Sequence, residues 1–198
     1  MTTLPPIDDV ASWLRAQPSL IGRALALDLT TLPDDPVELF LRWLGEAVRA
    51  GVAEPHAVTL ATVDADGLPD ARTLVLKDVD ERGWAVAGQR SSHKGNQLAA
   101  QPAAALNFWW QPLVRAVRLR GAAVEASREE SEADLAARST SAREGIAPED
   151  WVRWRIEPVR VEFWQGSPDR RHTRIVYERT GTAWSRNVLG GEGALGAA

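Results

Sequence analysis

Several basic side chains lie close together near the end of the chain, in the segment EFWQGSPDRRHTR (Glu162–Arg174). Arg170, Arg171, His172 and Arg174 follow an aromatic pair and a Gly-Ser-Pro turn within this one segment. Guanidinium groups repel one another unless an anion lies between them, and a phosphate accepts short, charge-assisted hydrogen bonds from several of them. The segment therefore predicts a site for an anionic ligand, and a solvated hairpin rim is the alternative.

Two other segments carry cations where an anion could bind. Arg72 and Lys77 lie at the two ends of one predicted strand with opposite parity, so a single ligand contacts both only by wrapping the strand's end. The segment SSHK (Ser91–Lys94) opens a predicted helix, and helix-start amides, a hydroxyl and an ammonium together suit an anion. Both segments also have ordinary explanations, because Lys77 can mark a strand exit and the serines can cap the helix.

Metal binding and nucleophilic hydrolysis are not favoured by the sequence. His56, His93 and His172 are far apart, with no His-x-x-x-His or His-x-Glu spacing, and the chain has no cysteine. No G-x-S-x-G motif occurs. GEGALG (Gly191–Gly196) matches the letters of a dinucleotide fingerprint, but that motif needs a following helix, so we interpret it as a chance match.

Composition is that of an ordinary soluble globular protein. The chain has 198 residues, of which 44% are hydrophobic and 25% are charged, so it can bury one sizeable core. A net charge of −4 disfavours nucleic-acid binding. No apolar run approaches the length needed to cross a bilayer, and Met1–Asp9 lacks the basic-then-apolar layout expected of a signal peptide. We therefore expect a cytoplasmic protein with no membrane or nucleic-acid partner. We expect one domain over 1–189, with an N-terminal helical segment, followed by a flexible Gly/Ala-rich tail over 190–198.

Nine tryptophans are spread along the chain. We expect most of them to lie in the core or at a subunit interface, since a buried indole removes a large apolar area from water. One or two could stack on a flat ligand.

Strand patterns outnumber helical ones. A helix is predicted over 36–50, with Asp35 as its cap and Glu38 as a capping-box partner, and shorter helices over 8–16, about 92–100 and 127–139. Strands are predicted over 57–63, 69–77, 83–87, 103–110, 116–125, 156–164, 173–179 and 183–188, while 140–154 is ambiguous. Short strands joined by tight turns predict a mainly β fold with flanking helices (α+β), built as an antiparallel barrel or sandwich.

Four segments, in this order, resemble the pyridoxamine/pyridoxine 5′-phosphate oxidase family over roughly residues 34–188. They are DPVELFLRWL (Asp35–Leu44), ATVDADGLPDARTLVLK (Ala61–Lys77), SSHKGNQL (Ser91–Leu98) and EFWQGSPDRRHTRIVYER (Glu162–Arg179). The resemblance implies an FMN-binding antiparallel split β-barrel that forms a homodimer, with the flavin at the interface.

The resemblance also implies a role for individual residues. The cofactor-binding residues would be Arg72, Thr73, Lys77, Ser92, Lys94, Trp164 and Arg174. The substrate-binding residues would be Lys77, Arg138, Arg170 and His172, of which Arg170 and His172 would be catalytic. The implied reaction is hydride transfer from the 4′ carbon of pyridoxamine or pyridoxine 5′-phosphate to the flavin, followed by reoxidation with O₂.

The chain departs from the family pattern mainly on the substrate side. Asp134 and Ala142 stand where the family has a Tyr and a Ser toward the substrate phosphate, and an aspartate there would repel it. Ala116 replaces a glutamine that meets the flavin, His93 stands where arginine is common, and 140–154 is shorter than in the family. Two alternatives therefore stay open: a flavoenzyme of this fold with another substrate, or a non-catalytic flavin-binding protein.

Overall fold

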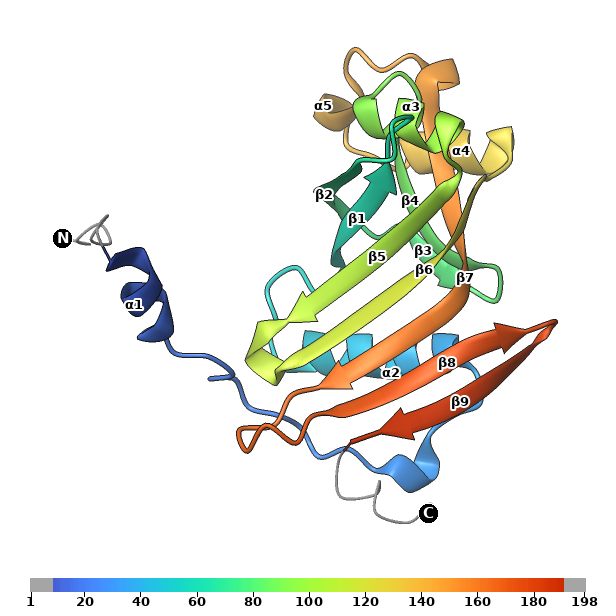
Figure 1. The fold of residues 1–198 in the computed structure, drawn as a ribbon. Coiled ribbons are helices and arrows are strands. Elements are labelled where there is room, and N and C mark those ends of the chain that lie inside the picture. The colour runs from blue at the N-terminus through green and yellow to red at the C-terminus, as the bar shows by residue number, and fades with distance from the viewer. Residues whose placement is uncertain (1–8, 191–198) are drawn as a thin grey trace.

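One antiparallel sheet dominates the computed structural model, which describes residues 9–190 (Figure 1). Its strands are β1 (Ala57–Val63), β2 (Pro69–Val75), β3 (Asp78–Asp80), β4 (Gly83–Gln89), β5 (Ala103–Trp110), β6 (Arg115–Glu125), β7 (Trp151–Gln165), β8 (Thr173–Thr180) and β9 (Ala183–Leu189). The strand order is β2-β1-β5-β6-β7-β4-β3, and β8 pairs with β7 and β9. This half-barrel confirms the predicted mainly β fold with flanking helices.

The first four helices begin near the residues that the sequence predicts, and the fifth lies in 140–154, which the sequence left ambiguous. They are α1 (Val10–Arg15), α2 (Pro36–Arg49), α3 (His93–Ala100), α4 (Arg128–Ala136) and α5 (Thr140–Arg143). Asp35 caps α2 by accepting from the Val37 N–H, and Ser127 and Glu130 form the predicted capping box of α4. Glu38 does not complete a capping box; it pairs with Arg42 at 3.3 Å instead. α1 buries none of its residues and lies apart from the sheet (Figure 1).

α2 packs across one face of the sheet and forms the core with it (Figure 1). Leu39, Phe40, Trp43 and Ala47 of α2 are at most 1% exposed. A partly buried ion pair fastens this helix to the sheet, because the buried Arg115 at the start of β6 binds Glu46 of α2 and stacks over Trp43 at 4.1 Å. Burial lowers the pKa of Arg115, and Glu46 opposes that shift by stabilising the charged guanidinium.

The predicted strand boundaries are wrong in one region, where charged residues lie inside the sheet. β2 ends before Lys77, β3 was not predicted at all, and β7 begins five residues before the predicted Ile156. Arg153 of β7 binds Asp78, and Arg155 binds Asp80 at 2.8 Å, so charges on β3 and β7 compensate each other. A pattern of apolar alternation misses strands of this kind.

None of the helices in the described part of the chain is long and apolar enough to cross a membrane. The predicted tail and its GEGALG sequence lie almost wholly outside the described residues, of which Gly190 is the last.

Candidate functional site

Arg72 of β2 is held by a network of polar side chains. Its guanidinium donates to Asp70 at 2.6 Å, to Gln97 of α3 at 2.9 Å and to the Thr62 hydroxyl at 2.5 Å. Thr62 and Gln97 are 1% and 4% exposed, and the Thr62 hydroxyl donates to the Gln97 amide oxygen at 2.6 Å. These hydrogen bonds use only the two terminal nitrogens of Arg72. The Arg72 Nε–H therefore has no hydrogen-bond acceptor among residues 9–190.

Ser92 and Lys94 lie beside Arg72 at the start of α3. Ser92 is the N-cap, and its hydroxyl oxygen accepts from the Gly95 N–H and from the Lys94 ammonium at 3.1 Å. Burial lowers the pKa of Lys94, and the positive charge of Arg72 lowers it further. Two cations, a hydroxyl and the amides at the start of α3 thus lie together. An anion bound here would relieve the repulsion between Arg72 and Lys94. We call Arg72, Ser92 and Lys94 the cation cluster.

A second group of side chains crosses four neighbouring strands in one row. Trp109 of β5 pairs with Ala116 of β6, Ala116 with Trp164 of β7, and Trp164 with Arg174 of β8. The indoles of Trp109 and Trp164 lie 6.0 Å apart between centroids. A hollow of about 270 Å³ adjoins this aromatic row and is lined by Ala116, Arg118, Glu162, Trp164 and Arg174. Two indoles, a guanidinium and a hollow together suit a flat, electron-poor ring.

Glu162 holds Arg174 in place. Its side chain is 6% exposed and meets Arg118 at 2.8 Å, Arg160 at 3.2 Å and Arg174 at 3.4 Å. Burial alone would raise the pKa of Glu162, but the hydrogen bonds and charges of Arg118 and Arg160 outweigh burial and lower it. The carboxylate therefore stays ionised near neutral pH and anchors Arg174 beside the aromatic row.

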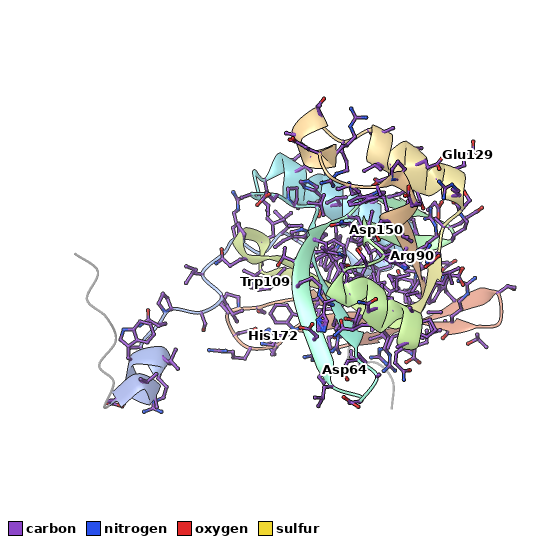
Figure 2. The ribbon with its side chains drawn as sticks, turned by 90° about the horizontal axis from the view of Figure 1, so that it is seen from above. Asp64, Arg90, Trp109, Glu129, Asp150 and His172 are labelled. Carbon is purple, nitrogen blue, oxygen red and sulfur yellow. The ribbon has the colours of Figure 1, made fainter. Side chains whose placement is uncertain are left out.

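The turn after β7 presents Arg170 and His172. The Ser167 N–H donates to His172 Nδ1 at 3.0 Å, so the neutral imidazole carries its proton on Nε2. The His172 ring lies 4.9 Å from the Trp164 ring, and Arg170 is exposed with a positive φ of 67°. Trp109 and His172, both labelled in Figure 2, thus each contact Trp164.

Lys77 and Arg138 lie in a third group of side chains, together with Asp134 and Trp151. We call these four residues the Lys77 cluster. The Lys77 ammonium lies 3.4 Å from Asp134, which also accepts from the Trp151 indole at 2.9 Å. Arg138 stacks over Trp151 at 4.6 Å and donates to the Ala142 carbonyl at 3.1 Å. The side chain of Asp134 is 11% exposed, and its negative charge offsets the positive charge of Lys77 that an anionic substrate would need.

The cation cluster and the aromatic row occupy opposite faces of the sheet. Arg72 pairs with Leu60, and Leu60 with Leu106, so Arg72 shares the face of Leu106. Trp109 lies three residues after Leu106 on β5 and therefore faces the other side. Arg72 and Trp164 also lie on strands that are four places apart in the sheet order.

The structure brings the predicted residues together in three groups rather than one. The cation cluster adjoins the Lys77 cluster, because Gln89 pairs with Trp151 and Ser91 donates to Asp150. Thr73 faces away from Arg72 on β2 and is exposed. Within residues 9–190, no group of three or more His, Asp or Glu side chains could hold a metal ion.

Sequence reasoning did not identify the residues that hold these side chains. Asp70, Thr62 and Gln97 position Arg72, and Glu162 positions Arg174. Glu162 is one of three charged residues in the predicted strand 156–164, so the sequence alone does not distinguish it. The contribution of Trp109 could not be recognised without the strand register.

Two family models match the chain. The model described as "Pyridoxamine 5'-phosphate oxidase" matches residues 44–165, and the model described as "Pyridoxine 5'-phosphate oxidase C-terminal dimerisation region" matches residues 151–190.

Curated relatives and solved structures agree with these matches. A pyridoxine/pyridoxamine 5′-phosphate oxidase of Thermosynechococcus vestitus is 39% identical over 184 residues, covering 77% of this chain and 87% of that protein. One of Rubrobacter xylanophilus is 36% identical, covering 77% and 85%. The crystal structure of PhzG from Burkholderia lata, in complex with tetrahydrophenazine-1-carboxylic acid, is 28% identical with a TM-score of 0.78, covering 86% and 100%. An FMN-binding protein of Nostoc punctiforme is 20% identical with a TM-score of 0.66, covering 81% and 99%, and shows the same fold.

Replacing Glu162 with Gln should destabilise the protein by roughly 2 kcal/mol near neutral pH, because three guanidinium groups lose their anionic partner. The pKa of Glu162 lies below its ordinary value of 4.5, so its ionised form stabilises the fold above that pH. This stabilisation is lost as the pH falls through the lowered pKa. Urea unfolding at several pH values should therefore show a gap between wild type and Glu162→Gln that shrinks below pH 4.5.

Glu178→Gln is the matched control, because Glu178 pairs with Arg160 at 2.6 Å but is 50% exposed. We expect it to change stability by less than about 1 kcal/mol. A Glu162→Gln gap that stays constant down to acidic pH would contradict the assigned role of this carboxylate.

Proposed function

The chain belongs to the pyridoxamine 5′-phosphate oxidase family, and on that premise we propose that it is an FMN-dependent oxidoreductase that oxidises pyridoxamine or pyridoxine 5′-phosphate to pyridoxal 5′-phosphate, with O₂ as acceptor. One observation carries the proposal: the same chain builds a cation cluster suited to a phosphate and an aromatic row suited to a flat ring. FMN has both parts.

The flavin phosphate binds at the cation cluster in this proposal. Arg72 is already fixed by its network, and the Lys94 ammonium lies beside the Ser92 hydroxyl. Because the charge of Arg72 lowers the pKa of Lys94, an anion between them stabilises both charged forms. Thr73 and Lys77 are assigned to the same cofactor site by resemblance alone.

The flavin ring binds at the aromatic row, against Trp164 and Arg174. One FMN cannot reach both groups of residues on a single chain, because they lie on opposite faces of the sheet. A homodimer resolves this, since the row of one chain can complete the cation cluster of its partner. The match of residues 151–190 to a dimerisation region supports this arrangement.

When bound, FMN would accept a hydride from the substrate and pass the electrons on to O₂. The protein's own residues bind and orient the substrate. Arg170 and His172 face it, and the bond from Ser167 to His172 Nδ1 leaves Nε2–H as the donor. Lys77 and Arg138 are assigned to the substrate's phosphate end.

A second candidate differs in the substrate and is favoured by the Lys77–Asp134 ion pair. A phosphate at the Lys77 cluster meets the negative charge of Asp134 as well as the two cations. A substrate without a phosphate avoids this repulsion, and the related PhzG was crystallised with a tricyclic carboxylic acid that has no phosphate. The alternative is therefore oxidation of a partly reduced heteroaromatic acid at the same flavin.

The flavin assignment predicts that Arg72→Ala weakens FMN binding by roughly 1.5–3 kcal/mol, because the phosphate loses a charged hydrogen-bond partner. The measurement is fluorescence titration of the apoprotein with FMN and with riboflavin, which lacks the phosphate. Riboflavin binding should be nearly unchanged in the variant. Equal FMN affinity in wild type and Arg72→Ala would remove Arg72 from the cofactor site.

Peroxide release separates the two substrates. The leading proposal predicts turnover of pyridoxamine 5′-phosphate in preference to pyridoxamine, and a lower KM for the phosphate in Asp134→Asn. This variant keeps an acceptor for the Trp151 indole while it removes the negative charge. A wild-type flavoprotein that is reduced by a dihydro-heteroaromatic acid, but not by pyridoxamine 5′-phosphate, would support the second candidate instead.

A further inference from the structure

Trp109 is a large apolar side chain that the core does not use. It is 47% exposed, whereas its neighbour Trp110 is 1% exposed and donates its indole N–H to the Pro55 carbonyl at 2.8 Å. The two tryptophans point to opposite faces because successive residues of a strand alternate. The Trp109 indole has no recorded hydrogen-bond partner within residues 9–190, and its ring contact is with Trp164. A core-packing role therefore does not explain this residue.

The strand register places Trp109 in the same row as the residues assigned to the flavin ring. Ala116 separates it from Trp164, and Arg174 follows on β8. Ala116 carries only a methyl group, so position 116 offers a ligand no hydrogen bond from its side chain. The Trp109 and Trp164 rings approach each other across this small residue, at 6.0 Å with a tilt of 48°. The two indoles thus form one continuous aromatic surface beside Ala116.

The row offers both aromatic and charged surface. The hollow beside it is lined by Ala116, Trp164 and the charged Arg118, Glu162 and Arg174, and Glu162 is engaged by arginines, whereas Trp109 lies outside this lining and adjoins it through Trp164. A planar, electron-deficient heteroaromatic ring gains from packing against electron-rich indole. A saturated or strongly hydrated ligand does not gain in this way.

We propose that Trp109 is a further flavin-binding residue, which packs with Trp164 against the ring system. The inference rests on the proposed FMN function and deepens it. Trp109 then contributes to the affinity for the flavin ring and contributes nothing to the affinity for the FMN phosphate.

The test compares FMN with riboflavin on the dimeric protein. Trp109→Ala should weaken the binding of both ligands by the same factor, about three- to tenfold. Trp109→Phe should recover most of the loss, because it keeps an aromatic face. Asn107→Ala is the positional control, since Asn107 lies on the same strand and face but in the next row, paired with Arg118, and it should leave both affinities unchanged.

Each outcome decides a separate point. Unchanged riboflavin affinity in Trp109→Ala overturns the inference and leaves the FMN function standing. A loss confined to FMN also overturns it, because the phosphate and not the ring would then be affected. If Trp109→Ala lowers the molar mass from dimer to monomer, the residue serves the interface and the inference fails. Failure of the wild type to bind FMN overturns both the inference and the proposed function.

Discussion

The alternation of side chains across the central strands is the constraint on which the rest of the structure depends. One face of β5, β6 and β7 must pack against α2, so Phe108 and Trp110 point into the core. Trp109, which lies between them, must then point to the other face. The strand register places Trp164 and Arg174 in the same row on that face. The same rule puts Arg72 on the core side of the sheet. A site that uses both sets of residues therefore has to be shared between two chains.

Arg72, Arg174 and Lys77 each lie against a carboxylate. Asp70 orients Arg72 within a network of buried neutral groups, and Glu162 orients Arg174 while three arginines share its charge. Asp70 compensates Arg72 and leaves the charge of Lys94 for an anion. Asp134 likewise compensates Lys77 and leaves the charge of Arg138, which stacks on Trp151. The two sites therefore carry similar net charge, and they differ in that Asp134 lies directly against Lys77, a residue assigned to the substrate.

The sequence was sufficient for the parts of the fold that local chemistry determines. The strand Ala103–Trp110, the cap at Asp35 and the capping box at Ser127 follow from alternation and hydrogen-bonding capacity. β3 and the first residues of β7 could not be predicted, because Arg153 and Arg155 are compensated by Asp78 and Asp80 from a strand far away in the sequence. For the same reason, the residues that position Arg72 and Arg174 became identifiable only once the pairing of strands was known.

The most direct test of the shared site is a mixing experiment with two variants that each remove one half of it. Arg72→Ala and Arg174→Ala are each expected to bind FMN poorly as homodimers. In mixed dimers, one of the two sites keeps both arginines, so refolding the variants together should restore about a quarter of the wild-type number of high-affinity FMN sites. Recovery of these sites supports a site built from two chains. No recovery, in mixtures shown by mass spectrometry to contain the mixed dimer, would contradict it.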